Sequence, residues 1–166
     1  GISGGIYQNN WKEYLGTALV NPMVAGTNYQ LKFNISSIAV LGSTAYNINN
    51  MPNLEPVYVT IYGKANSPIF PLNTLNDPTT FDPSWIVLGQ TLYSPNTSWG
   101  EISINFNPTI SINAVMIGAP INLPNSYPIH QPSGSSSYRP YMLYDNLRLN
   151  TLLSFESEIT STGNFC

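Results

Sequence analysis

Residues 29–35 read YQLKFNI, a stretch in which every odd position is apolar and every even position is polar. Successive side chains of a strand point to opposite faces of its sheet, so a period of two predicts a strand with one buried face. Residues 101–106, EISINF, alternate in the same way, and residues 57–62, VYVTIY, place aliphatic side chains on one face and Tyr, Thr and Tyr on the other. These stretches predict a β-protein, because the buried face of a helix repeats about every 3.6 residues.

Further strands are expected at about residues 13–20, 36–42, 85–92, 113–120 and 141–149, between clusters of turn-forming residues. The 14 prolines and 12 glycines are scattered along the chain and leave no room for a long helix. Pairs such as Asn21-Pro22 and Asn107-Pro108 favour turns. Roughly eight strands joined in this way predict an all-β fold, a two-sheet antiparallel β-sandwich of the jelly-roll type.

The composition excludes some partners and favours a location. Charged residues make up 8% of the chain, against about 25% in an average soluble domain. The net charge of -3, with only five Lys and Arg residues, argues against a nucleic-acid partner, which requires clustered basic side chains. No apolar run approaches the roughly 20 residues that cross a bilayer, so we expect no direct membrane insertion. Low charge with many Asn, Ser, Thr and aromatic residues favours an extracellular or cell-surface location.

The length of 166 residues suggests one domain. We expect the sandwich to occupy residues 1–151 and residues 152–166 to form a linker into a following domain, with a final edge strand of the same domain as the alternative. The only cysteine, Cys166, is expected to pair outside this sequence. Two long Pro- and Ser-rich stretches, residues 65–84 and 122–140, predict loops that are functional or mobile.

Several short motifs follow one another in a familiar order along residues 4–150: GGIY at 4–7, KEYLGT at 12–17, WIVLG at 85–89 and YMLYDNLRL at 141–149. Their order resembles that of jelly-roll modules in large secreted proteins of gliding and related Bacteroidetes, and the last motif is similar to the closing strand of galactose-binding-like and carbohydrate-binding modules. The resemblance implies export by type 9 secretion and a role in surface adhesion or glycan binding. The implied partners are a glycan or other cell-surface polymer, or proteins of secretion and gliding motility.

Modules that resemble this chain usually begin with an earlier strand, which is missing from the sequence. We therefore expect the sandwich to lack its first strand and to expose unpaired backbone groups at one edge. A partner strand, or an N-terminal piece bound nearby, is expected to cover that edge.

Asp145 is the acidic residue that the sequence places most distinctively. It shares its parity with Leu143, Leu147 and Leu149, which puts its carboxylate on the apolar face of the last strand. An ionised carboxylate there needs a hydrogen bond, a pairing cation or a metal ion. The resemblance implies a structural calcium ion at this position, although calcium takes six to eight oxygen ligands. A carboxylate satisfied by backbone amides or a nearby hydroxyl is the alternative.

Aromatic side chains are the candidate ligand-binding residues, because Tyr and Trp combine an apolar ring with a polar group. Tyr58 and Tyr62 lie opposite the aliphatic face of residues 57–62, while Tyr127 and Tyr138 lie in the long stretch 122–140. A binding platform is one interpretation of these four residues. Packing on the second face of a two-layer sandwich is the other.

Two further polar residues complete the candidate binding set. His130 is the only histidine and has no Cys or second His nearby that would make a transition-metal site, so a single loop hydrogen bond is the alternative to ligand binding. Arg139 follows Tyr138 and offers a bidentate contact to an anion or a sugar hydroxyl, with solvation in the loop as the alternative.

The sequence carries no catalytic motif. There is no Gly-x-Ser-x-Gly elbow, and no pair of acids is placed by the pattern at the roughly 5–10 Å separation that glycosidases use. We therefore predict a non-catalytic carbohydrate-binding or adhesin-like module of an exported cell-surface protein. The alternatives are a structural spacer or cap in a long surface filament, and a cargo or subunit of a secretion or motility assembly.

Overall fold

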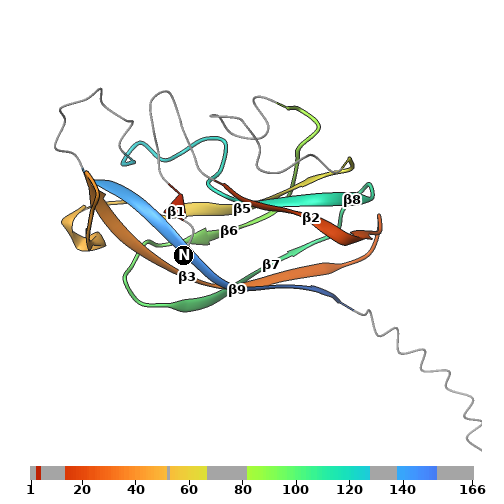
Figure 1. Ribbon diagram of the computed structural model, residues 1–166, viewed down its shortest axis with the longest axis horizontal. Coiled ribbons are helices and arrows are strands. Elements are labelled where there is room, and N and C mark those ends of the chain that lie inside the picture. The colour runs from red at the N-terminus through yellow and green to blue at the C-terminus, as the bar shows by residue number, and fades with distance from the viewer. Residues whose placement is uncertain (1–2, 5–13, 52, 67–81, 128–137, 153–166) are drawn as a thin grey trace, which may run out of the picture.

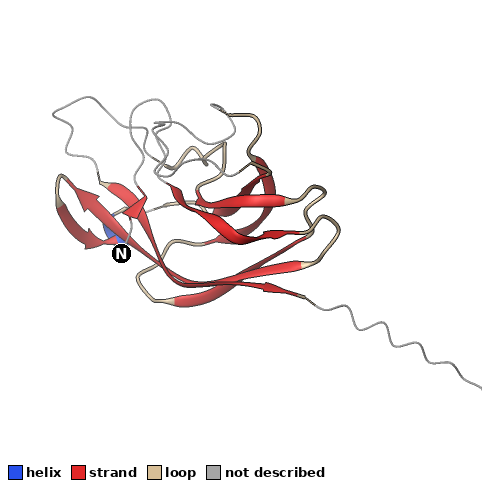
Figure 2. Ribbon diagram, turned by 45° about the vertical axis from the view of Figure 1, so that its right-hand side comes forward, coloured by secondary structure: helices blue, strands red, loops and turns tan. Residues whose placement is uncertain are grey.

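The computed structural model describes residues 3–4, 14–51, 53–66, 82–127 and 138–152. Two antiparallel sheets pack face to face in this part of the chain, so the predicted β-sandwich is confirmed (Figures 1 and 2). The strands are β1 (Ser3–Gly4), β2 (Tyr14–Met23), β3 (Tyr29–Leu41), β4 (Thr44–Asn47), β5 (Val57–Lys64), β6 (Ile86–Tyr93), β7 (Gly100–Phe106), β8 (Ile112–Gly118) and β9 (Arg139–Thr151), with one 3-10 turn, η1 (Ile48–Asn50).

The first sheet has the order β1-β9-β3-β4, and β7 also pairs with β3. The second sheet has the order β2-β8-β5-β6. The chain passes repeatedly from one sheet to the other, since β2, β5, β6 and β8 belong to the second sheet and β3, β4, β7 and β9 to the first. Strands that are distant in sequence therefore become neighbours, as β3 and β9 do along almost their whole length.

The two strands predicted at 29–35 and 36–42 form one continuous strand, β3. Its odd positions face the interior from Tyr29 through Ala39. The sequence does not show this alternation at Ser37, because Ser37 is a polar residue at a buried position. The Ser37 hydroxyl lies 2.9 Å from the hydroxyl of Tyr93 in β6. This hydrogen bond allows the polar side chain of Ser37 to be buried. The prediction of two separate strands at 29–35 and 36–42 was therefore wrong.

The space between the sheets is filled by the apolar faces that the alternation predicted. Phe33 and Ile35 from β3, Val59 and Ile61 from β5 and Ile104 from β7 are all buried. Burying an aliphatic or phenyl side chain of this size contributes about 1.5–3 kcal/mol. These residues give the sandwich its main core.

One long side of the sandwich is closed by β6 and β7, which approach each other across the two sheets. Gly89 of β6 marks the contact, since a Cβ at this position would lie 2.8 Å from Cγ2 of Ile104 and 3.2 Å from Cβ of Phe106. The opposite long side lies between β2 and β9. These two strands stand at the other end of the strand order in each sheet.

Candidate functional site

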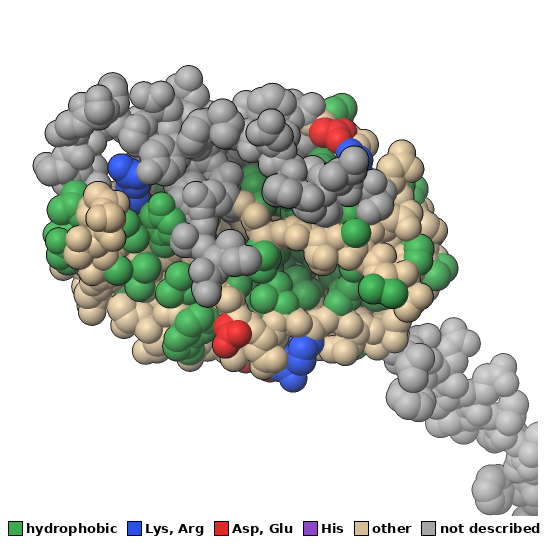
Figure 3. Space-filling model, in the orientation of Figure 1, with side chains coloured by type: hydrophobic (Ala, Val, Ile, Leu, Met, Phe, Trp, Pro, Cys, Tyr) green, Lys and Arg blue, Asp and Glu red, His purple; other side chains and the backbone are tan. Residues whose placement is uncertain are grey.

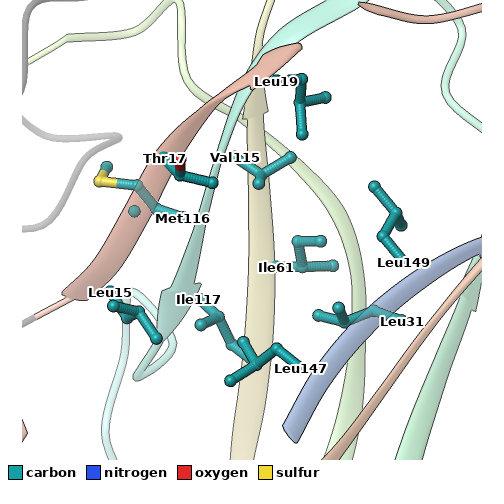
Figure 4. Close-up of a pocket in the computed structure, with 11 residues that line it drawn as sticks. Leu15, Thr17, Leu19, Leu31, Ile61, Val115, Met116, Ile117, Leu147 and Leu149 are labelled. Carbon is teal, nitrogen blue, oxygen red and sulfur yellow. The ribbon is translucent and has the colours of Figure 1, made fainter. Parts of the chain in front are cut away.

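An apolar cleft lies between the edges of the two sheets. Its volume is about 290 Å³, and its walls come from β2 and β8 on one side and from β3 and β9 on the other, with Ile61 of β5 between them (Figure 4). Figure 3 shows apolar side chains at the bottom of a hollow near the middle of this face. We call this feature the β2–β9 cleft; its lining residues are Leu15, Gly16, Thr17, Leu19, Leu31, Ile61, Val115, Met116, Ile117, Leu147 and Leu149.

The chemistry of the cleft is almost entirely aliphatic. Among the described residues of the lining, the hydroxyl of Thr17 is the single polar side-chain group, and there is no aromatic or titratable side chain. Leu31, Ile61 and Ile117 form a buried floor, whereas Leu147 at the mouth is 38% exposed. An apolar surface of this kind binds other apolar groups.

Both rims of the cleft are strand edges. On its outer side, β9 pairs only with the two residues of β1, Ser3 opposite Leu143 and Gly4 opposite Met142. In the described part of the chain, the outer edge of β9 from Tyr144 to Thr151 has no further strand beside it. β2 likewise pairs only with β8. Edges of this kind present a row of backbone donors and acceptors.

A β-bulge in β9 creates the apolar wall of the cleft. Lys32 of β3 pairs with Arg148 and Asn34 pairs with Asp145, so Asn146 and Leu147 together lie opposite one residue, Phe33. Asn146 has φ of 53°, a left-handed conformation that Asn tolerates better than most residues. The extra residue shifts the alternation by one position, as β-bulges do.

The bulge overturns the predicted position of Asp145. Before it, Met142 and Tyr144 pack against the core; after it, Leu147 and Leu149 face the cleft. Asp145 therefore points to the solvent face of the sheet, and its Oδ1 accepts a hydrogen bond of 2.8 Å from the backbone amide of Asn146. The prediction that Asp145 lies on the apolar face was wrong, because strict parity does not survive a bulge.

The alternative expected for Asp145, a carboxylate satisfied by a backbone amide, agrees with this contact. Among the residues that the structure describes, no group of three or more His, Cys, Asp or Glu side chains is arranged to hold a metal ion. A calcium ion at Asp145 stays a prediction, and the buried carboxylate that motivated it is not there.

The two predicted aromatic residues of β5 have different environments. Tyr58 is 44% exposed and lies opposite Leu92 of β6, which is 57% exposed. Tyr62 is fully buried in a second apolar cluster with Trp85, and its hydroxyl donates a hydrogen bond of 2.9 Å to the carbonyl of Ala119. Packing on the second face, the alternative interpretation, therefore holds for Tyr62, whereas Tyr58 remains open to a ligand.

Tyr127 and Tyr138 stand at the two ends of residues 128–137, which the structure does not describe. Tyr127 is buried against Val57, and its hydroxyl donates to the carbonyl of Glu55 at 3.1 Å. Burial raises the pKa of the Tyr127 hydroxyl above its ordinary value. Its role is that of an anchor, and its ring is not open to a ligand.

Tyr138 forms an aromatic pair with Tyr46 of β4. The ring centroids are 5.3 Å apart and the rings meet edge to face at 84°. Tyr46 is 37% exposed and Tyr138 is partly exposed. Arg139 follows as the first residue of β9, opposite Val40, while His130 lies outside the described residues. The sequence did not single out Tyr46, because nothing in its local pattern shows that β4 would turn back beside the start of β9.

The described residues form three ion pairs. Glu101 of β7 contacts both Lys32 of β3 and Arg148 of β9 on the solvent face of the first sheet, and the hydrogen bond from Lys32 lowers the pKa of the Glu101 carboxyl. Lys64 of β5 pairs with Asp82. That contact, helped by Ser84, lowers the pKa of Asp82 from 3.8 to about 2. Each carboxylate in these pairs is thus held in its charged form by a neighbour.

The cleft was not predicted from the sequence. One signal was present: Leu147 and Leu149 are apolar residues of equal parity in β9, and Leu15 and Leu19 of β2 alternate with polar or small residues in KEYLGTAL. That signal identifies a buried face. It does not show that two edges would remain apart, which depends on the strand order.

No family model, curated protein or solved structure matches the chain. In the described ranges, no helix has the length and apolar character required to cross a membrane. A function for the domain is therefore inferred from its fold and from two surfaces, the β2–β9 cleft and the Tyr46–Tyr138 pair.

Proposed function

We propose that this domain is a non-catalytic carbohydrate-binding or adhesin-like module of an exported cell-surface protein. The observation that supports the proposal is the Tyr46–Tyr138 pair, two partly exposed rings held edge to face at one end of the sandwich. Tyrosine serves at wet interfaces because its ring is apolar and its hydroxyl forms hydrogen bonds, and the C–H faces of a sugar pack on such rings.

The segments of chain on either side of residues 128–137 are held in place by the sandwich. Tyr127 fixes the chain before residues 128–137 through its buried ring and its bond to Glu55. Pairing of Arg139 with Val40 fixes the chain after them. A binding surface carried on a rigid scaffold loses little entropy when it binds, which favours recognition over a mobile surface.

The non-catalytic part of the proposal is supported by the β2–β9 cleft. Its lining supplies a single hydroxyl, from Thr17, and no titratable side chain, whereas general acid–base catalysis requires positioned titratable groups. The low charge of the whole chain is in keeping with a module that binds neutral polymers.

Glycan arrays and polysaccharide pull-downs test the proposal. Tyr46→Ala and Tyr138→Ala are expected each to lower retention by about tenfold or more, since stacking on an aromatic ring contributes roughly 1–2 kcal/mol. Trp99→Ala is the control, because Trp99 is an exposed aromatic residue outside the candidate binding set. Absence of retention on every glycan, or full retention by both alanine variants, would contradict carbohydrate binding.

A second function, a spacer or cap within a surface filament or a subunit of a secretion or motility assembly, is favoured by a different observation. The β2–β9 cleft combines an apolar lining with two strand edges, which are the elements that assemblies of β-domains use for contact. This function predicts association through the cleft and no retention on glycans.

A further inference from the structure

We propose that the β2–β9 cleft of one molecule receives residues 153–160 of a second copy as an added strand, antiparallel to β9. This inference goes beyond the proposed glycan binding and needs no glycan. It rests on the apolar lining of the cleft, on the unpaired length of β9 and on the residue pattern that follows Leu152.

The cleft has the shape that an added strand requires. In the described part of the chain, no strand lies beside the outer edge of β9 from Tyr144 to Thr151, and the lining next to this edge offers apolar contacts for one face of a strand. β1 already pairs with this same edge in the antiparallel direction, at Leu143 and Met142. An added strand would therefore continue an existing ladder. β-Strand addition gains affinity from the backbone and specificity from alternate side chains.

Residues 153–160 read LSFESEIT and match this requirement. Their odd positions hold Leu153, Phe155 and Ile159, with Ser157 between them, and all their even positions are polar. A strand places alternate residues on one face, so the three apolar side chains would enter the cleft together. At about 3.3 Å per residue, eight residues also match the open length of β9.

The charges agree with the same orientation. With odd residues in the cleft, Glu156 and Glu158 would lie on the solvent face of the first sheet, where Arg148, which also pairs with Glu101, lies beside the edge of β9. Asp145 lies on that face too, on the far side of the bulge. Attraction to Arg148 and repulsion from Asp145 together favour registers that keep the glutamates near Arg148.

The geometry of β9 assigns the strand to a second molecule. After the bulge, the ladder between β9 and β3 continues to the end of β9, where the amide of Leu152 donates to the carbonyl of Asn28 at 2.8 Å. Residues 151–155, TLLSF, contain no Gly, Pro, Asn or Asp, the residues that make tight reversals. To lie along its own β9, the chain would have to reverse within these residues. A contact between the tail of one copy and the cleft of the next is heterologous and can repeat.

The test measures self-association of the full chain by sedimentation velocity, in reducing buffer so that Cys166 forms no disulfide. The expected result is concentration-dependent association that weakens by about tenfold or more in the double variant Phe155→Asp/Ile159→Asp and in Leu147→Glu. Leu92→Glu is the matched control, because Leu92 is exposed on β6 at the far side of the sandwich, and it should associate as the wild type does. A synthetic LSFESEIT peptide should dissociate the wild-type assembly, and a peptide with the same residues in scrambled order should not.

Several outcomes would overturn the inference. One is a monomer at all concentrations, together with a peptide that does not bind. Another is association that survives the double tail variant, which would mean that a different surface or occupant fills the cleft. Saturable binding of a fatty acid in the cleft, with unchanged association of the tail variant, would identify the cleft as a lipid site. Circular dichroism melts of each variant distinguish loss of contact from loss of folding.

Discussion

The hydroxyl of Ser37 lies 2.9 Å from the hydroxyl of Tyr93 in the interior, where it joins the two sheets. Ser37 is 1% exposed, and the Tyr93 hydroxyl also contacts the carbonyl of Asn96. Ser37→Ala removes one partner and is expected to lower the free energy of unfolding by about 1–2 kcal/mol, because a buried polar group loses a hydrogen bond. Urea denaturation measures this. Ser103→Ala, at an exposed position of β7, should change stability little, and equal effects of the two changes would contradict the role of the pair.

The bulge in β9 depends on the left-handed conformation of Asn146. A β-branched side chain is strained there, so Asn146→Val is expected to destabilise the fold by about 1–3 kcal/mol, whereas Asn146→Gly should be close to neutral. Asn150→Val, at an exposed position of the same strand without this conformation, is the control. Thermal or chemical denaturation compares the three variants. If valine is tolerated equally at 146 and 150, the bulge does not constrain the strand.

Gly89 permits the close approach of β6 and β7 that closes one side of the sandwich. Gly89→Ala puts a methyl group against Ile104 and Phe106 and is expected to cost about 1–3 kcal/mol of stability through overpacking. Gly100→Ala provides the control, because a Cβ at Gly100 meets no atom within 4 Å. Each variant adds one methyl group to the wild type. A similar change in midpoint denaturant concentration for both variants would rule out the close approach of β6 and β7 at Gly89.

The Lys64–Asp82 pair predicts a dependence of stability on acid pH. Because folding lowers the pKa of Asp82 from 3.8 to about 2, the folded state keeps this carboxylate charged more readily than the unfolded state does. Its contribution is therefore complete above about pH 5 and is lost as pH falls toward 2. The pair is partly exposed, so the contribution is at most about 1 kcal/mol.

Melting curves of the wild type and Asp82→Asn at pH 6 and pH 2 measure this loss. The wild type should be the more stable at pH 6, and the two proteins should converge at pH 2. A difference between wild type and Asp82→Asn that is the same at both pH values would contradict the assignment.

Local alternation was sufficient to predict the fold class. Leu31, Phe33 and Ile35 are buried as their parity requires, and so are Val57, Val59 and Ile61. Alternation failed where the pattern was interrupted for a structural reason: at Ser37, which is polar but buried as half of a pair, and at Asn146, where the bulge exchanges the two faces of β9. Neither the burial of Ser37 nor the bulge at Asn146 can be recognised from a single sequence.

The candidate surfaces were harder to predict than the fold, because they depend on which strands become neighbours. Tyr138 was among the predicted binding residues, but its partner Tyr46 is 92 positions away and meets it only because β3 pairs with both β4 and β9. The β2–β9 cleft has the same origin. Leu15 and Leu147 are 132 positions apart, and only the sheet order places one across the cleft from the other.

Hydrogen exchange of the full chain with and without the LSFESEIT peptide tests the central claim, that the open edge of β9 accepts a strand, most directly. The experiment is done below the concentration at which the chain self-associates, and exchange is followed by mass spectrometry or NMR. The predicted result is slower exchange, by about tenfold or more, of backbone amides in Tyr144–Thr151, with amides of β4 and β6 unchanged. Unchanged exchange in β9 with saturating peptide, or slowing at β6 instead, would contradict the claim.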